Sequence, residues 1–505
     1  MTIDERVGGR SPVVRIASDV AAGDGDVVAR TARNAADSVS VVETGPTGIT
    51  GVEPLLLATI TGRTAFYPTP DTATVREVVD ALEAGELRSV DATAVVDHEE
   101  QPSSLPVPDE GALSVGHRSV LGPCGWVDPL APGEHKFVAT EHDAGAVADL
   151  KLLGRGRGDA VADEPAAEAW DLARETDGDP VVVVNANEAD HRPRGDRTLL
   201  AGAPFAVLDG AAAVARYIGA TDVVVHLNES DTALVQHVRK AVERVDLPID
   251  AQVVAGPDEY RAGAPTAALE VLEGAERIEP RLQPPTPAEY GLYGRPTVVH
   301  TPRTVAQVQH ALQTPEAFNP NATEIGTRLV TVTGDVAAPA TVELSTDATL
   351  DAVHEAVTVD SQFKLACVGG VFGGITSDLN VSPSAPALAA ADLGTDGVVE
   401  LLSEENCVVA EVGERARFAS NANSGRCVPG REGTQQLTEL LRDVYQGSFR
   451  SDDIRELARV MHRTSSCQIG AHAPRPVTTA INEFEPEFRA HADSRCPSGV
   501  CEENL

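Results

Sequence analysis

The chain has 505 residues and carries 40 basic against 77 acidic side chains, which gives a formal net charge of −37 at pH 7. Such a charge repels nucleic-acid phosphates and anionic lipids, and it argues against a nucleic-acid-binding protein. Hydrophobic residues make up 42% of the chain and charged residues 23%, so several folded domains are expected and wholesale disorder is excluded.

Arginine carries nearly all of the positive charge, because Lys136, Lys151, Lys240 and Lys364 are the only lysines. A carboxylate-rich, lysine-poor surface is typical of proteins that stay soluble in strong salt, where repulsion between charges is screened. We interpret the protein as salt-adapted, and we therefore treat most single carboxylates as surface residues.

The sequence shows no membrane or export signal. It has no window of about 18 uninterrupted apolar residues, and its start lacks a basic flank with an apolar core, so we expect a cytoplasmic protein. Its seven cysteines are odd in number and include no Cys-x-x-Cys pair. This pattern argues against a disulfide framework and against a zinc ribbon.

The predicted elements alternate between strands and helices. Residues 12–98 read as a small α/β unit, and the Pro-, Ser- and acid-rich stretch 97–110 is typical of a linker. Then follow strand 180–185, helix 203–218, strand 221–228, helix 230–245 and strand 249–256. This order predicts a parallel, doubly wound sheet that binds ligands beyond the carboxyl ends of its strands. A β-hairpin is predicted at 326–344 and a helical bundle at 431–491.

Three segments resemble one family. The segment 283–304 reads QPPTPAEYGLYGRPTVVHTPRT and is similar to KPPFPAxSGLYGKPTVVNNVET. The segment 185–197 reads NANEADHRPRGDR and is similar to NADESEPGTFKDR. The segment 429–433 reads PGREG and is similar to the end of SCGxCxPCREG. These motifs belong to the NADH-binding flavoprotein (F) subunit of respiratory complex I and its relatives in NAD-linked hydrogenases and formate dehydrogenases. The resemblance runs from about residue 12 to residue 491 in the same order.

The front of the chain resembles the fused, hydrogenase-type version of that protein. VETGPTGITGVEPLLL at 42–57 is similar to a thioredoxin-like 2Fe-2S segment, and RSVLGPCGWVDP at 118–129 to the connecting segment. The resemblance implies a multi-domain α/β protein with five parts. These are a thioredoxin-like domain (1–98), a connecting segment (99–145), a Rossmann-like FMN/NADH-binding domain with a parallel sheet (146–322), a β-grasp (SLBB-like) domain (323–395) and a helical iron-sulfur-binding-type domain (396–505).

In that family a hydride passes from NADH to FMN, and electrons continue into iron-sulfur clusters. The four cysteines of the family's 4Fe-4S site fall on Ser424, Cys427, Gly430 and Cys467, so Cys427 and Cys467 remain as candidate metal ligands. In the front domain, the cysteines expected for a 2Fe-2S cluster are also replaced. We therefore expect both the 4Fe-4S and the 2Fe-2S clusters to be absent, and the sequence leaves open whether Cys496 or Cys501 replaces a missing ligand.

The resemblance also implies a flavin and nucleotide site. Its candidate cofactor-binding residues are Gly154, Arg155, Gly156, Asn185, Asn187, Glu188, Tyr260, Gly263 and Thr304. Several family positions that face the ligand are changed, and these are Arg157, Asp159, Ala264, Pro265, Gln283, His300 and Thr301. Binding of FMN and NAD(H) is thus implied, but with many altered contacts.

These substitutions predict a homologue with eroded cofactor sites that is not an efficient electron carrier, and no catalytic residue is assigned. The alternative is an active NADH:acceptor oxidoreductase subunit that retains FMN and NAD binding, so the sequence leaves open whether the protein is an enzyme. A third hypothesis is an anionic ligand held by Arg157, His191, Arg192 and Arg194. The expected partners are redox-complex subunits or an assembly partner, without nucleic acid or membrane insertion.

Overall fold

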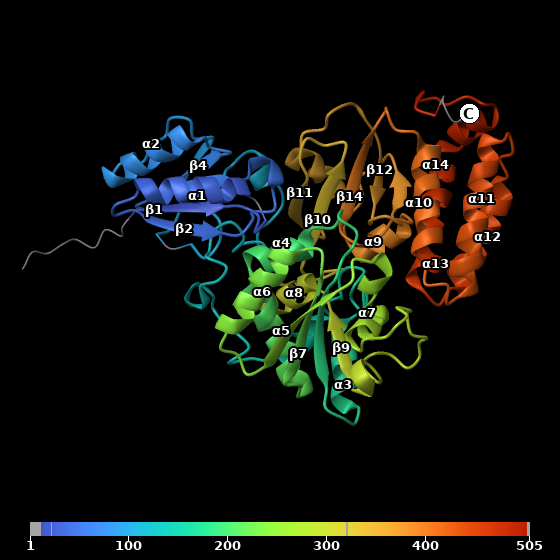
Figure 1. Cartoon of the computed structure of the whole chain (residues 1–505), viewed down its shortest axis with the longest axis horizontal. Helices are drawn as coiled ribbons and strands as arrows, with labels where there is room; N and C mark the ends of the chain where they lie inside the picture. The colour runs from blue at the N-terminus through green and yellow to red at the C-terminus, as the bar shows by residue number, and fades with distance from the viewer. Residues whose placement is uncertain (1–11, 22, 101, 320–321, 502–505) are drawn as a thin grey trace, which may run out of the picture.

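The computed structural model describes residues 12–21, 23–100, 102–319 and 322–501. They form a mixed α/β structure with three sheets, as the sequence predicts. In Figure 1 the first sheet lies at the left, the parallel sheet below the centre, the third sheet above it, and a group of helices at the right.

The first sheet has the strand order β2-β1-β3-β4-β5 and is covered on one face by two helices. Its elements are β1 (Val13–Ala17), α1 (Gly23–Ala35), β2 (Ser40–Thr44), β3 (Leu55–Ile60), β4 (Arg63–Pro68), α2 (Thr72–Glu83) and β5 (Ala94–Asp97). Side-chain alternation along β1 places Val14 and Ile16 against the helices, while Ala17 packs on the other face with residues of the third sheet. The first unit is therefore joined to the rest of the molecule through a shared core.

The central sheet is parallel throughout, in the order β8-β7-β6-β9. Its strands are β6 (Val181–Ala186), β7 (Asp222–Asn228), β8 (Asp250–Gly256) and β9 (Thr297–His300), and its helices are α3 (Ala166–Glu175), α4 (Gly195–Gly202), α5 (Pro204–Ile218), α6 (Thr232–Arg244), α7 (Pro265–Leu272) and α8 (Pro302–Gln313). Val182 and Val184 pack into the core that contains α5, whereas Val181 and Val183 pack with Leu269 of α7. Burial on both faces explains the run of four valines and confirms the predicted parallel sheet.

The third sheet is mixed, with the order β11-β10-β14-β12-β13. Its elements are β10 (Thr327–Gly334), β11 (Ala340–Ser345), β12 (Phe363–Val368), β13 (Gly374–Thr376), α9 (Ala385–Ala390) and β14 (Val398–Ser403). The predicted hairpin is present as the antiparallel pair β10-β11, and β14 runs parallel to β10 on its other side. The names thioredoxin-like and β-grasp, and the domain boundaries, stay predictions.

The C-terminal region is helical, as predicted. It contains α10 (Val408–Ala422), a π-helical turn (Pro429–Gly433), α11 (Thr434–Tyr445), α12 (Ser451–Thr464), α13 (Gln468–His472) and α14 (Arg475–Ala492). Leu437, Ile454 and Phe488 share one buried core. Among the described residues no single helix is both long and apolar enough to cross a membrane, and the α4–α5 pair that meets the length and composition test is bent by 100°.

Candidate functional site

A cleft of about 1020 Å³ lies where the parallel sheet, the third sheet and the C-terminal helices meet. Its lining residues come from five stretches, within 153–164, 260–266, 280–283, 369–396 and 462–475. The stretch 260–266 follows β8, so this central cleft lies beyond the carboxyl end of a parallel strand, where such sheets place their ligands. Its volume is that of a pocket for a cofactor-sized molecule.

A glycine turn forms one wall of the central cleft. Gly156 has φ +85°, in the left-handed region that favours glycine. A Cβ on Gly154 would lie 2.3 Å from the carbonyl oxygen of Val161, and a Cβ on Gly158 would lie 3.0 Å from the side-chain nitrogen of Asn185. Close chain approach therefore explains why glycine occupies these positions.

Arg155, one of the predicted cofactor residues, faces away from the central cleft. Its buried guanidinium donates to the carbonyl oxygens of Leu153 (2.7 Å), Ile325 (2.6 Å) and Thr327 (3.0 Å). Burial lowers the pKa of Arg155 to about 10. The side chain thus anchors the glycine turn to β10 and has a supporting role.

Arg157 and Glu188 form a two-pronged ion pair in the wall of the central cleft. Nη2 of Arg157 lies 2.6 Å from Oε1 of Glu188, and Nε lies 3.2 Å from Oε2. The guanidinium sits 3.9 Å from the ring centroid of Tyr260, whose other ring contacts are with Phe372 and Phe418. Burial alone would lower the pKa of Arg157, but the Glu188 carboxylate raises it, so the cation is permanent.

Asp159 is a buried carboxylate at the N-terminus of α8. It accepts hydrogen bonds from Thr304 Oγ1 (2.7 Å), the Thr301 N–H (3.3 Å) and His300 Nδ1 (3.0 Å). Trp170 Nε1 donates to His300 Nε2 at 2.7 Å, so the proton of the neutral imidazole lies on Nδ1 and points at Asp159. A helix N-terminus favours an anion, and here the protein supplies that anion itself.

The amides of Asn185 and Asn187 are oriented by one histidine. Asn187 Nδ2 lies 3.4 Å from Nε2 of His226, whose Nδ1 lies 3.2 Å from Oδ1 of Asn185. Burial lowers the pKa of His226 to about 4, so its ring is neutral near pH 7. With its nitrogen directed to His226, Asn187 leaves its buried Oδ1 without a donor in the described part of the chain. That oxygen is free to accept a hydrogen bond from a ligand.

Asp396 is one of the carboxyl groups that line the central cleft. Burial raises the pKa of Asp396 to about 6, and the nearby Arg157 opposes that rise. The charge of the cleft wall therefore changes slightly below neutral pH.

The predicted metal ligands Cys427 and Cys467 lie together, with their sulfur atoms 3.2 Å apart. A Cβ on Gly430 would lie 3.1 Å from the first sulfur and 3.0 Å from the second, so Gly430 faces the pair. Cys467 lines the central cleft. The structure thus assembles three of the four positions that the resemblance assigns to a cluster, one of them without a side chain.

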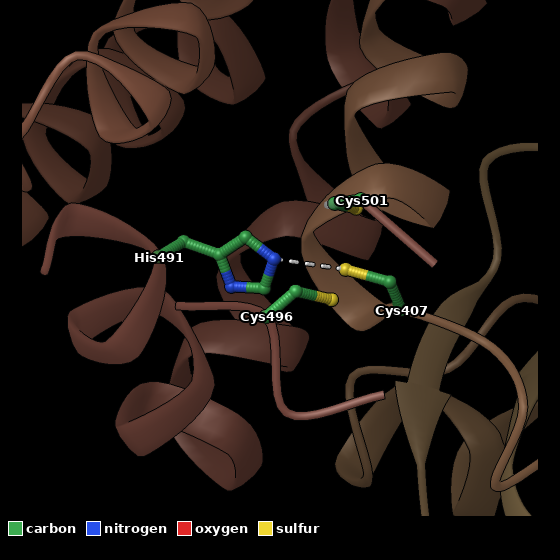
Figure 2. Close-up of side chains that lie close together, drawn as sticks. All are labelled: Cys407, His491, Cys496 and Cys501. Atoms are coloured by element: carbon green, nitrogen blue, oxygen red, sulfur yellow. Dashed lines mark hydrogen bonds between the residues drawn. The ribbon is translucent and has the colours of Figure 1, made fainter. Parts of the chain in front are cut away.

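A second group of sulfur ligands lies in the C-terminal region and was not predicted. Cys407, His491, Cys496 and Cys501 are all buried, and one ligand atom from each lies within 4.8 Å of the others. Figure 2 shows their side chains converging from two segments of the chain, with His491 directed at Cys407. The only sequence signal is the even spacing His491-x₄-Cys496-x₄-Cys501, because Cys407 is far away in the chain.

Two family models match the chain. The Nuo51 FMN-binding domain matches residues 147–310, and the iron-sulfur binding region of NADH-ubiquinone oxidoreductase-F matches residues 411–491. These matches cover the glycine turn, the parallel sheet and the C-terminal helices. Over these two regions the chain belongs to the family of NADH-binding flavoprotein F subunits.

Two relatives are similar to this chain over most of their length. The NADP-reducing hydrogenase subunit HndC of Solidesulfovibrio fructosivorans is 27% identical over 417 residues, which cover 75% of this chain and 84% of the relative. The F subunit of the NADH-quinone oxidoreductase of Streptomyces coelicolor is 29% identical over 380 residues, covering 70% and 84%. A crystal structure of a NAD⁺-reducing [NiFe]-hydrogenase in the H₂-reduced state shares the fold, with a TM-score of 0.66 and 24% identity over 96% of this chain and 85% of that chain.

The expectation that iron-sulfur clusters are absent from this chain is wrong. Residues 411–491 match the family's iron-sulfur binding region, and Cys407, His491, Cys496 and Cys501 form a ligand group from the two ends of that region. The family motif contains none of these four residues. Cys496 and Cys501 join Cys407 and His491 rather than the Cys427 pair.

The remaining predicted site residues lie in or beside the central cleft, and their roles stay predictions. Tyr260 lines the cleft, and Thr304 holds Asp159. Gly263 packs so closely that a Cβ there would lie 2.2 Å from the carbonyl oxygen of Asn187. The proposed anion-binding group of four basic residues does not assemble, because of these only Arg157 lines the central cleft and Arg192 pairs with Glu400.

Proposed function

We propose that the chain is an active oxidoreductase subunit of a multi-subunit redox complex, which oxidises NADH or a related dinucleotide and uses FMN and iron-sulfur centres. The observation that carries this proposal is the central cleft of about 1020 Å³, which is retained beside the glycine turn of a chain that matches an FMN-binding family. Named relatives are subunits of a quinone oxidoreductase and a hydrogenase, so the partners are further redox subunits. A cytoplasmic location agrees with these partners.

Two acceptor oxygens in and beside the central cleft fit a flavin. Asn187, which lines a smaller adjoining pocket with Arg157 and Asp396, offers a buried oxygen without a donor among the described residues, and Gln468 in the cleft lining has a second such oxygen. A flavin ring and its ribityl chain present N–H and O–H donors that can satisfy these oxygens. Glu188 and Arg157 supply one fixed charge of each sign beside them.

The part of the site expected to bind the FMN phosphate suits that group less well, because the Asp159 carboxylate already accepts hydrogen bonds at the N-terminus of α8. A phosphate there would lie against a buried carboxylate, and two anions in one place repel each other. We therefore expect FMN to bind more weakly than it would with glycine at position 159. The two family-position donors, Thr301 N–H and Thr304 Oγ1, are present but already donate to Asp159.

When bound, FMN supplies the two-electron to one-electron conversion that a hydride donor and iron-sulfur acceptors require. The chain's own residues bind and orient. Arg157, fixed by Glu188, presents a permanent cation to an anionic ligand, and the ring of Tyr260 supports that cation from 3.9 Å away. Arg157 is buried, so its contact with Glu188 is stronger than the same contact would be in water.

The proposal is tested with full-length protein purified natively in high salt. We expect it to quench FMN fluorescence on titration and to reduce a dye acceptor steadily when NADH is added. The variant Arg157→Met is expected to weaken both signals at least tenfold, whereas Arg459→Met, which changes an exposed arginine paired with Glu456, leaves them unchanged. A folded chain that binds neither FMN nor NADH and reduces no dye contradicts the proposal.

A second candidate is a non-catalytic relative that keeps the fold as an assembly partner. One observation favours it, namely that the carboxylate of Asp159 occupies the anion position of α8. Co-purification with redox subunits, without flavin and without dye reduction, would select this second function.

A further inference from the structure

The C-terminal segment after α14 is held in the core by sulfur-containing side chains. Cys496 and Cys501 lie beyond the end of α14 and are 9% and 5% exposed, respectively. They meet Cys407, which caps the N-terminus of α10, and His491 in the last turn of α14. Residues separated by more than 80 positions in the sequence are thus brought to one point, as Figure 2 shows.

The histidine is oriented as a metal ligand. Nδ1 of His491 lies 2.8 Å from the carbonyl oxygen of Glu487 and donates to it, which leaves the lone pair of Nε2 free. Nε2 points at the sulfur of Cys407, 3.2 Å away. A backbone carbonyl that fixes one ring nitrogen while the other faces a ligand group is the usual support of a metal-bound imidazole.

The spacing of the four ligand atoms suits one point of coordination. All four lie within 4.8 Å of one another. A tetrahedral ion with metal–sulfur bonds of about 2.3 Å has sulfur atoms about 3.8 Å apart, so small side-chain rotations would bring the group to that geometry. Three thiolates and one imidazole are also soft ligands that prefer zinc or iron to calcium or magnesium.

We propose that Cys407, His491, Cys496 and Cys501 form a closed Cys₃His site for a thiophilic metal centre, either a single zinc ion or an iron-sulfur cluster. The protein supplies all four ligands, so the site is structural and joins the C-terminal segment to α10 and α14. None of the four residues lines the central cleft, and the site is separate from the Cys427–Cys467 pair. The proposal therefore stands whether or not the cleft binds FMN.

The first experiment measures metal and labile sulfide in the full-length chain after native purification and removal of loosely bound ions. We expect a stoichiometric metal centre: zinc without labile sulfide identifies a single ion, and iron with labile sulfide identifies a cluster on the same ligands. Cys496→Ser and Cys501→Ser should each lower the metal content at least fivefold. Cys367→Ser, which changes a buried cysteine outside the group, should leave it unchanged.

A second measurement keeps the test valid if a variant does not fold. Wild-type protein stripped of metal is titrated with Co²⁺, and we expect thiolate-to-cobalt absorbance that saturates at one ion per chain. Three results would overturn the proposal. The first is full metal content in Cys496→Ser, and the second is a wild-type chain that holds no stoichiometric metal and shows no cobalt bands. The third is a disulfide between Cys496 and Cys501 in the natively purified chain.

Discussion

The variant Asp159→Ala tests whether the protein supplies its own anion at the N-terminus of α8. It removes the carboxylate that accepts hydrogen bonds from Thr304, Thr301 and His300, and it leaves two or three of these donors buried without an acceptor. An unsatisfied buried donor costs about 1–3 kcal/mol, and a carboxylate at a helix N-terminus contributes about 0.3–1 kcal/mol. We therefore expect a loss of about 4 kcal/mol in the free energy of unfolding.

The same variant should gain affinity for anions. With the carboxylate gone, phosphate or the phosphate of FMN can accept from the freed donors, and a ligand at 100 times its Kd restores about 2.7 kcal/mol. The assay is thermal unfolding of both proteins with and without inorganic phosphate and FMN. Asp97→Ala, which breaks an exposed ion pair with Arg63, is the control and should cost about 0–1 kcal/mol. Equal stability of variant and wild type, or equal stabilisation of both by the anions, would refute the reasoning.

Three further predictions concern pH and packing. Burial raises the pKa of Glu53 from 4.5 to about 7. The contribution of protonated Glu53 to the free energy of unfolding is therefore complete below pH 4.5 and is lost as pH rises through 7. Denaturant unfolding from pH 4 to 8 should show the free energy of unfolding falling by about 3 kcal/mol, a fall that Glu53→Gln lacks. Anion binding in the central cleft should weaken as pH rises through 6 because Asp396 becomes charged, and a pH series with Asp396→Asn should be flat over that range. Gly210→Ala should lower the free energy of unfolding by about 2 kcal/mol, because the new Cβ would lie 2.0 Å from the carbonyl oxygen of Val305. Gly413→Ala has open space around the new Cβ and should raise the free energy of unfolding by about 1 kcal/mol in the same assay.

The central sheet could be predicted because its sequence pattern follows directly from its surroundings. Val181 to Val184 are buried on both faces, and a parallel strand covered by helices on each side needs such a run of apolar residues. The segment 97–110 was predicted less well. Leu105 is buried, and Pro102 accepts a hydrogen bond from the indole of Trp126, so part of this linker-like stretch packs against the core. Such contacts depend on tertiary partners that composition does not reveal.

The candidate site could be predicted in its location but not in its contacts. The sequence placed ligand-facing residues after β6 and β8, and Glu188 and Tyr260 do lie together there. It could not show that Arg155 turns away to support β10 while Arg157 turns toward Glu188, because both arginines belong to one glycine-rich turn. The Cys407 group was missed for a related reason, since its members come from distant parts of the chain.

The most direct test of the account is an anaerobic absorbance spectrum of natively purified protein during titration with NADH. The account predicts flavin absorbance in the blue that survives dialysis in high salt and is bleached by about one equivalent of NADH. A colourless chain with its full helical signal, which takes up no added FMN and leaves NADH unoxidised, would contradict it.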